Sequence, residues 1–222
     1  KVYQLPQAGR HARGRPLVNL LPLEQDERIT AFLRLGEYQT GHFIFMATKN
    51  GTVKKCAISS FARPRSTGLR AIELMDDDEL VAVNLTTGTS NVLLFGSTGK
   101  AIRFHEKEVR EMGRTARGVR SIKLKRDGDK VVGMAVVSED QPHLLSVSEN
   151  GYGKRTAIEE YRTQGRGGSG LTNFKLNAKT GNVASVLAVN EQDDIMVVSD
   201  KGMMIRTGVA QVSLIGRSTS GV

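Results

Sequence analysis

The sequence predicts an all-β fold built from repeated four-stranded units. Three observations lead to this prediction. A hairpin pattern recurs at intervals of about fifty residues, a glycine-centred marker follows each hairpin, and no stretch shows convincing helical periodicity. Repeats of this length with four short strands each are typical of propeller-like architectures, in which each sheet packs its faces against neighbouring sheets. We therefore expect one domain made of successive blades.

Each repeat opens with an apolar strand that runs into a polar turn closed by glycine. The turns fall at Asn50-Gly51, Thr98-Gly99, Asn150-Gly151 and Lys201-Gly202. Asn-Gly between extended runs is a favoured two-residue hairpin turn, because both central positions need a positive φ that Asn and Gly adopt at little steric cost. A basic residue stands four places after each turn glycine, at Lys55, Arg103, Arg155 and Arg206. The pattern predicts four hairpins with a cation at the same place in each.

A second marker follows each hairpin after a polar loop. Its glycines are Gly14, Gly68, Gly118 and Gly170, and Gly221 opens a fifth copy. Apolar residues stand four and six places after these glycines, which is the alternation of a half-buried strand. They are Val18 and Leu20, Ile72 and Leu74, Ile122 and Leu124, and Phe174 and Leu176. A fourth strand is predicted in ITAFL (29–33), LVAV (80–83), VVGMAVV (131–137) and VASVLAV (183–189).

The repeats divide a single domain, residues 1–222, into units of nearly equal length. The full units are 42–90, 91–142 and 143–193, and partial units lie at 1–41 and 194–222. We expect KVYQLP (1–6) to be the tail of a hairpin whose first strand is missing, and Gly221-Val222 to begin a strand that stops. The expected shape is an arc that is incomplete at both ends of the fragment.

The charge balance favours a polyanionic partner. Lys and Arg number 32 against 23 acids, which gives a net charge of +9. Aromatic residues are only 5% of the chain and Trp is absent, which argues against a base-stacking platform for single strands. Backbone contact with duplex DNA is the better form of the hypothesis. No apolar run approaches the length of about 20 residues that a membrane span requires, so no membrane partner is expected.

The basic residues cluster in one part of each repeat, from the hairpin's second strand to the following loop, and acids cluster in the turn before the fourth strand. A lone basic strand is most often a solvated face, but copies in register favour a functional band. The acidic turns, such as Asp76 to Glu79, are expected to be solvated. The candidate contacts to DNA are Lys54, Lys55, Arg63, Arg65, Arg70, Arg103, Arg114, Arg117, Arg120, Lys154, Arg155, Arg162, Arg166, Arg206 and Arg217.

Residues for catalysis, metal binding or cofactor binding are not recognisable. The four histidines are scattered without partners at metal-ligand spacing, and nothing forms a set of nucleophile, base and orienting group. The single cysteine, Cys56, excludes an intramolecular disulfide and fits a reducing cytosol. We expect no enzyme activity in this chain, no metal and no cofactor.

Several long stretches resemble one family closely, in the same order along essentially all 222 residues. These stretches are KVYQLP, ARGRPLVNLLPLEQDERITA, FMATKNGTVKK, NGYGKRTA and IGRSTSGV, and they resemble the C-terminal domain of bacterial DNA gyrase A. The resemblance implies a β-pinwheel, whose propeller-like blades exchange strands with their neighbours and bind DNA around a basic outer perimeter. It also implies an ATP-dependent type II topoisomerase whose catalytic residues lie outside the fragment. The implied partners are duplex DNA, the rest of gyrase A and the gyrase B protein, and the implied location is the cytoplasm, at the nucleoid.

The resemblance further implies a seven-residue gyrase box, Gln-Arg-Arg-Gly-Gly-Lys-Gly, in the first blade, where DNA wrapping needs it. We expect the fragment to begin after that place and therefore to bind and bend DNA without the full wrap. A box-like run at 164–170 keeps Gln164, Arg166, Gly167, Gly168 and Gly170, but has Gly165 and Ser169 where the box has Arg and Lys. It is either a box-like loop in a later blade or an ordinary basic, glycine-rich loop.

Two alternatives remain from the sequence. The corresponding C-terminal domain of topoisomerase IV shares the repeat, although the gyrase-like stretches favour gyrase. A propeller that binds a protein partner would need an apolar or aromatic patch at its loop tips, whereas the loops here are rich in Arg, Gly and Ser.

Overall fold

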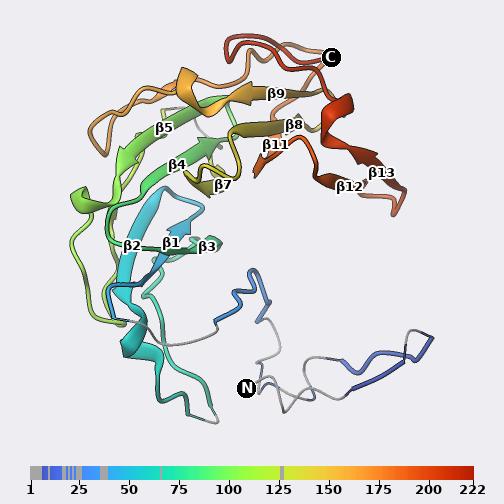
Figure 1. Cartoon of the computed structure of the whole chain (residues 1–222). Coiled ribbons are helices and arrows are strands. Elements are labelled where there is room, and N and C mark those ends of the chain that lie inside the picture. The colour runs from blue at the N-terminus through green and yellow to red at the C-terminus, as the bar shows by residue number, and fades with distance from the viewer. Residues whose placement is uncertain are drawn as a thin grey trace.

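The chain forms an arc of antiparallel sheets, as the computed structural model shows (Figure 1). The structure describes residues 7–9, 11–16, 19, 21, 23, 27–35, 40–65, 67–125 and 128–222. Four sheets follow one another along the arc, and the helical elements of the described residues are short 3-10 turns. The predicted all-β fold is confirmed. The expected hairpin tail at 1–6 and the expected strand at Val18 and Leu20 lie outside the described residues.

Three hairpins and their inner strands form the first three sheets, and a lone hairpin forms the fourth. The sheet orders are β3-β1-β2-β6, β10-β5-β4-β7, β11-β8-β9 and β12-β13. The strands are β1 (Phe43–Thr48), β2 (Thr52–Ala57), β3 (Leu80–Thr86), β4 (Asn91–Gly96), β5 (Lys100–His105), β6 (Val119–Arg120), β7 (Val131–Val136), β8 (His143–Ser148), β9 (Gly153–Ala157), β10 (Leu171–Thr172), β11 (Val183–Val189), β12 (Asp194–Val198) and β13 (Met204–Gly208). The 3-10 turns are η3 (Ile58–Phe61), η4 (Glu106–Glu108), η5 (Ile158–Glu160) and η6 (Val209–Gln211).

All four predicted hairpins are present, but their turns differ from the two-residue type that the sequence predicted. The N–H of Gly51 donates to the carbonyl oxygen of Thr48 at 3.0 Å, and Gly51 has φ +81°. Among the described residues Asp77 is the single non-glycine with a positive φ, so Asn50 has an ordinary negative φ. The connection is therefore a three-residue loop, in which a type I-like turn is followed by a left-handed glycine. Only the glycine needs the conformation that other residues avoid.

The first two sheets take their outermost strand from the next repeat. β6 follows the second hairpin in sequence but pairs with β2 of the first, with Val119 opposite Val53. β10 follows the third hairpin and pairs with β5 of the second, with Leu171 opposite Ala101. In the fifth copy, Val222 and Gly153 exchange two backbone hydrogen bonds of 3.0 Å. This exchange is the β-pinwheel arrangement that the resemblance implied.

Two strand predictions were wrong in detail. The exchanged strand lies one or two residues after the marker glycine, whereas the sequence placed it at Ile122–Leu124 and Phe174–Leu176. Ile122 and Phe174 are buried in the apolar cores, and each lies close to the turn glycine of the preceding hairpin, the Ile122 side chain at Gly51 and the Phe174 carbonyl group at Gly99. Residues 70–75 and ITAFL (29–33) form no strand, because no described segment pairs with them.

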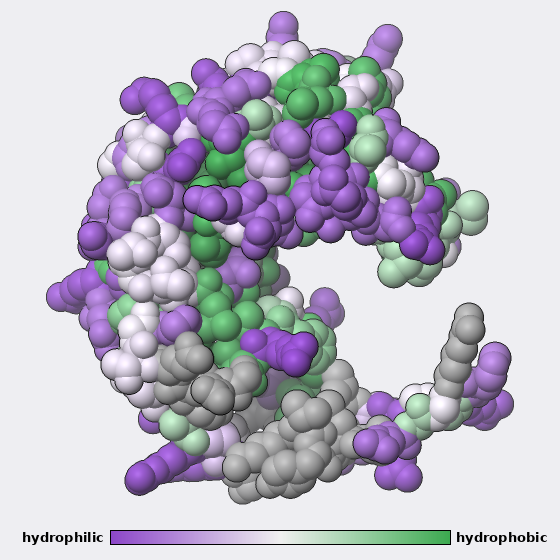
Figure 2. Space-filling view, in the orientation of Figure 1, coloured by the Kyte–Doolittle hydropathy of each residue, from purple (hydrophilic) through white to green (hydrophobic). Residues whose placement is uncertain are grey.

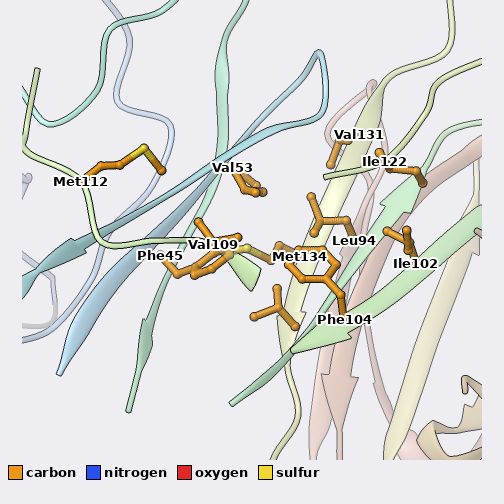
Figure 3. Close-up of a cluster of buried hydrophobic side chains, with 12 residues drawn as sticks. Phe45, Val53, Leu94, Ile102, Phe104, Val109, Met112, Ile122, Val131 and Met134 are labelled. Atoms are coloured by element: carbon orange, nitrogen blue, oxygen red, sulfur yellow. The ribbon is translucent and has the colours of Figure 1, made fainter. Parts of the chain in front are cut away.

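The apolar cores lie between neighbouring sheets. Figure 3 shows one of them, in which Phe45 of β1 and Phe104 of β5 lie with ring centroids 6.5 Å apart. Along β4, Val92 and Leu94 belong to this core, whereas Leu93 and Phe95 belong to the core shared with the third sheet. A strand with both faces buried reads as a continuous apolar run, which explains why the hairpin strands carried the clearest sequence signal.

The marker glycines allow close contact between a crossing chain and the sheet below it. Gly118 has φ +116° and Gly170 has φ +70°. A Cβ at Gly118 would lie 2.5 Å from the carbonyl oxygen of Val53, and one at Gly170 would collide with the carbonyl of Ala101. Gly68 also has a positive φ, but an added Cβ there would meet nothing within 4 Å. A substitution at Gly68 would therefore cause backbone strain alone, whereas one at Gly118 or Gly170 would cause both strain and a steric collision.

Gly170→Ala should therefore destabilise the chain more than Gly68→Ala. The left-handed backbone alone costs an alanine about 1 kcal/mol at either position. The collision at Gly170 should add about 1–3 kcal/mol, in the range of other overpacked sites. Urea unfolding of the two variants and the parent chain measures the difference. Equal losses at the two positions would show that the crossing chain does not approach the sheet this closely.

Candidate nucleic-acid interface

Four segments each run from the end of a 3-10 turn past a marker glycine. We call residues 62–70, 109–120, 161–172 and 212–222 the crossover segments. Every basic residue in them is an arginine, and Glu111 is their only acid. Arginine presents a planar fork of donors that matches a phosphate group better than the point charge of lysine. The arginines are Arg63, Arg65, Arg70, Arg110, Arg114, Arg117, Arg120, Arg162, Arg166 and Arg217.

The crossover segments lie on the outside of the arc. In Figure 1, β2, β5 and β9 lie toward the outer side and β3, β7 and β11 toward the inner side. Two crossover segments pair with outer strands, through β6 on β2 and β10 on β5, and Val222 of a third bonds to Gly153 of β9. Figure 2 shows hydrophilic side chains projecting along this outer edge. Seven of the arginines are exposed: Arg63, Arg65, Arg70, Arg110, Arg117, Arg120 and Arg162. Arg110 was not among the sequence candidates, although its place in a crossover segment could have identified it.

One exposed arginine has a carboxylate partner. Arg117 pairs with Glu73 at 3.2 Å, and both side chains are largely solvent-exposed. Exposed pairs of this kind contribute roughly 0–1 kcal/mol, so a phosphate can replace the carboxylate at little cost. Among the residues that the structure describes, the other six exposed arginines form no ion pair. The outer edge therefore presents cations that are available to a polyanion.

Two candidate lysines are buried instead. Lys54 and Lys154 have no exposed area, and they occupy the same place in their hairpins. The ammonium group of Lys154 donates to the carbonyl oxygens of Gly216 at 2.9 Å and Arg217 at 2.7 Å, and to Oγ1 of Thr219 at 3.2 Å. Lys54 donates to the carbonyl oxygens of Ala71 and Arg114 in the same way. Both lysines hold crossover segments against the sheet.

The cations four places after the turn glycines form a second interior set. Arg103 donates from Nη1 to the carbonyl oxygens of Ile158 and Tyr161, which begin and follow the next 3-10 turn. Arg155 reaches the carbonyl oxygens of Ala210 and Val212 around η6.

At the equivalent position in the first hairpin, Lys55 donates to the carbonyl oxygen of Glu106 at 3.1 Å. Its ammonium group also lies 3.6 Å from the carboxylate of Glu106, with both side chains buried. Each cation of this set therefore ties its own blade to the 3-10 turn of the next blade.

Five of the predicted DNA contacts are instead bound to other parts of the protein: Lys54, Lys55, Lys154 and Arg155 are buried, and Arg103 is half-buried. The sequence analysis placed the second strand of each hairpin at the surface. In the structure, chain from the next repeat covers β2 and β5. Arg206, the fourth copy, is exposed and pairs with Asp194 on the neighbouring strand. Within the described chain no following 3-10 turn covers Arg206.

The acidic turns hold the hairpin turns in place, a role that the sequence did not indicate. Asp78 is buried, and its Oδ1 accepts from the backbone N–H groups of Asn50 and Glu79 at 2.9 Å. Asp129 accepts from the hydroxyls of Ser97 and Thr98. Acids therefore gather at the hairpin-turn end of the sheets, which we call the turn rim.

The box-like loop lies on the crossover segment of the preceding repeat. The N–H of Gln164 donates to the carbonyl oxygen of Arg103 at 2.7 Å, and that of Gly167 donates to the carbonyl oxygen of Ser121 at 2.6 Å. Arg166 is half-buried, and its backbone N–H donates to the carboxylate of Glu108 at 2.7 Å. Gly168 accepts from the N–H of Lys123 at 2.8 Å, and Gly170 makes the close approach described above.

Burial shifts the ionisation of several interior groups. It lowers the pKa of Lys154 to about 8 and also lowers the pKa of Lys54. It raises the pKa of the Cys56 thiol, which donates to the carbonyl oxygen of Met112 at 3.0 Å. It also raises the pKa of Tyr161, whose hydroxyl donates to Asn173 Oδ1 at 2.5 Å. Each of these groups is held by hydrogen bonds inside the protein, which indicates a structural role.

Other kinds of site are not evident in the described part of the chain. No group of three or more His, Cys, Asp or Glu residues in it could hold a metal ion. No helix formed by the described residues is long and apolar enough to span a membrane. A groove of about 690 Å³ lies between the last two sheets, where Leu187, Met196 and Met203 are exposed. Its walls are mostly faces of β8, β11 and β12, together with two hairpin turns at 149–151 and 199–203.

Comparison with known proteins identifies relatives across the whole chain. A family described as "DNA gyrase C-terminal domain, beta-propeller" matches residues 1–35, 42–87, 90–138, 142–190 and 193–222. The DNA gyrase A protein of Salmonella typhimurium (strain LT2) is 51% identical over 100% of this chain, and that of Escherichia coli (strain K12) is 50% identical over 100%. The chain spans 25% of the length of each of these relatives.

Two solved structures share the fold. The C-terminal domain of DNA topoisomerase IV superposes with a TM-score of 0.90 at 25% identity, covering 100% of this chain and 69% of that one. The DNA gyrase A C-terminal domain superposes with a TM-score of 0.84 at 29% identity, covering 95% of this chain and 70% of that one. The sheet arrangement described above is therefore common to both.

The lowered pKa of Lys154 predicts how stability depends on pH. The unfolded chain keeps a proton on this lysine up to about pH 10.5, whereas the folded chain releases it near pH 8. Between these values the unfolded state binds more protons, so folding is favoured as pH rises. The free energy of unfolding of the parent chain should therefore rise relative to that of Lys154→Met from pH 8 to pH 10.5.

Chemical denaturation of both proteins across this range measures the difference. The shift at Lys54 is present in both proteins and cancels. A difference that falls with rising pH would contradict the prediction, because it would mean that the three acceptors around the ammonium group outweigh the effect of burial.

Proposed function

Because the chain belongs to the family of DNA gyrase C-terminal domains, we propose that it binds duplex DNA along the crossover segments and bends the duplex around the arc. One observation carries the proposal: the crossover segments hold ten arginines and one acid on the outside of a curved row of sheets. Equivalent positions in successive repeats lie at equivalent places along the arc. The seven exposed arginines therefore form a curved track for phosphates.

Bending follows from the curvature of this track. A duplex with a persistence length of roughly 150 bp resists tight bending, and curving a short site costs a few kcal/mol. Each arginine that neutralises a phosphate releases counterions, and this release offsets the cost of bending. A straight duplex could touch only one or two crossover segments. A bent duplex can touch all of them, so binding and bending are coupled.

The interaction should be tolerant of sequence. Contacts to phosphates fix the position of the protein on DNA but carry no direct information about the bases. No recognition helix is present among the described residues, and their crossover segments contain a single aromatic residue, the buried Tyr161. The track therefore fits the duplex backbone rather than base edges.

The proposed role in the cell follows from the family. We propose that the chain acts as one non-catalytic unit, residues 1–222, of an ATP-dependent type II topoisomerase in the bacterial cytoplasm, at the nucleoid. In this role it presents a bent DNA segment for strand passage by the rest of gyrase A and the gyrase B protein. No metal or cofactor is required for phosphate contacts by arginine.

The affinity for DNA should fall steeply with salt. Seven arginines that each neutralise about one phosphate predict a slope of about −6.3 in log affinity against log salt, and replacing Arg63, Arg65 and Arg70 together by Gln should weaken it to about −3.6. Titrations at several salt concentrations with two unrelated duplexes of equal length measure the slope. A slope near zero for the parent chain, or a strong preference for one duplex, would rule out the proposal.

A matched control tests where the DNA binds. Lys49, Lys130 and Lys179 lie at the turn rim, so replacing all three by Gln removes the same charge from the other end of the sheets. The salt slope should then stay within about one of the parent value. An equal loss of slope in both triple variants would mean that net charge alone drives binding.

Bending should be visible directly. A duplex of about 40 base pairs, labelled at its ends with a fluorescent donor and acceptor, is close to straight when free. Saturation with the chain should raise the transfer efficiency, because the ends approach one another as the duplex follows the arc. Binding without a rise in transfer would show that the chain holds DNA but does not bend it.

A further inference from the structure

Consecutive crossover segments are joined to one another by a repeated arginine contact. Arg166 donates from Nη1 to the carbonyl oxygen of Arg120 at 2.6 Å, and Arg217 donates to that of Thr172 at 2.9 Å. Arg114 makes the equivalent contact to the carbonyl oxygen of Arg70 at 3.4 Å. Three junctions between crossover segments thus carry the same link.

The link has a fixed register. Each of the three arginines stands four residues before a marker glycine, within Gly-Arg-x-x-x-Gly, and each acceptor stands two residues after the preceding marker glycine. A backbone hydrogen bond accompanies each link. The N–H of Lys123 donates to the carbonyl oxygen of Gly168 at 2.8 Å, that of Lys175 to Thr219 at 2.9 Å, and that of Glu73 to Ala116 at 3.3 Å. The box-like run at 164–170 is the middle copy of this motif.

The three arginines differ from the exposed ones in their surroundings. Arg114, Arg166 and Arg217 are half-buried. Arg166 also donates from Nε to the carbonyl oxygen of Glu108, whose carboxylate accepts from the backbone N–H of Arg166. The backbone of Arg217 likewise donates to the carboxylate of Glu160 at 3.0 Å. These guanidinium groups are therefore each bound to a backbone carbonyl oxygen of the preceding crossover segment.

The geometry points to a positioning role. A single backbone hydrogen bond between two crossover segments leaves them free to rotate about it. A second contact, made by a rigid guanidinium plane, fixes both their spacing and their relative angle. We propose that Arg114, Arg166 and Arg217 set the spacing of consecutive crossover segments, and with it the curvature that bound DNA follows. This inference rests on the proposed function, but the spacing itself can be measured without DNA.

The test compares two triple variants with the same net charge. The first replaces the positioning residues: Arg114→Met, Arg166→Met and Arg217→Met. The control replaces one exposed arginine in each of three crossover segments: Arg63→Met, Arg110→Met and Arg162→Met. Methionine keeps an apolar stem but has no donor. Circular dichroism and thermal unfolding establish that both fold. If the first triple variant does not fold, Arg166→Met alone replaces it, because its link lies in the middle of the arc.

The arm without DNA measures the distance between blades. Spin labels are placed on Ser60→Cys in η3 and Glu159→Cys in η5, both at exposed positions, while Cys56 is buried and remains unlabelled. The positioning variant should at least double the width of the distance distribution between the labels. The control variant should leave it unchanged. An unchanged width in the positioning variant would overturn the proposal.

The arm with DNA separates positioning from binding. The positioning variant should lose more than half of the rise in end-to-end energy transfer at saturation while its salt slope changes by less than about one. In the control variant, the slope of log affinity against log salt should be weaker by about three, but the energy transfer at saturation should equal that of the parent chain. A positioning variant that loses slope as the control does, and bends DNA as the control does, would show that its arginines are ordinary phosphate contacts. If the parent chain neither binds nor bends DNA, the proposed function fails, and the spin-label arm still decides whether the arginines hold the blades.

Discussion

The fold depends on pairing the outer edge of each hairpin with chain from the next repeat. A β-strand at the edge of a sheet leaves a row of backbone N–H and C=O groups without partners. Here β2 and β5 gain theirs from β6 and β10, and β9 gains its partner from the last residues of the chain. The marker glycines, the buried cations and the outward position of the crossover segments all follow from this one requirement, because each is needed to bring the crossing chain onto the strand.

The sequence predicted local structure well and the partners of each strand poorly. The hairpins were predictable because their strands are buried on both faces and their turns close with glycine. The burial of Lys54 was not predictable, because the carbonyl oxygen of Arg114 that it reaches lies 60 residues away. Arg63 stands nine residues after Lys54 in the same acid-free stretch, yet it is exposed. Composition places both Lys54 and Arg63 in one basic stretch. Only the strand exchange shows that Lys54 lies beneath a crossover segment whereas Arg63 lies on the surface of one.

The two sets of cations perform different physical tasks. The interior cations donate to backbone carbonyl oxygens, and Lys55 and Arg155 also pair with the carboxylates of Glu106 and Glu191. These contacts tie one repeat to the next. The exposed arginines face solvent, with exposed carboxylates near some of them in sequence, such as Glu108 and Glu111 on either side of Arg110. The excess of arginines over acids in the crossover segments attracts a negatively charged duplex before contact. The excess of basic residues therefore serves two purposes: interior cations join the repeats, and exposed arginines are available to bind DNA.

Strand exchange has a consequence for synthesis on the ribosome. The first hairpin is complete at Ala57, but its outer edge receives β6 only after Arg120 has been made. During that interval β2 is an open edge among other unfinished chains, where unpaired strands join with one another. Adjacent lysines in the middle of β2 discourage such joining, since two copies of the strand would bring like charges together. Lys54 and Lys55 can thus protect the nascent chain first, and become internal ties once the next repeat has arrived.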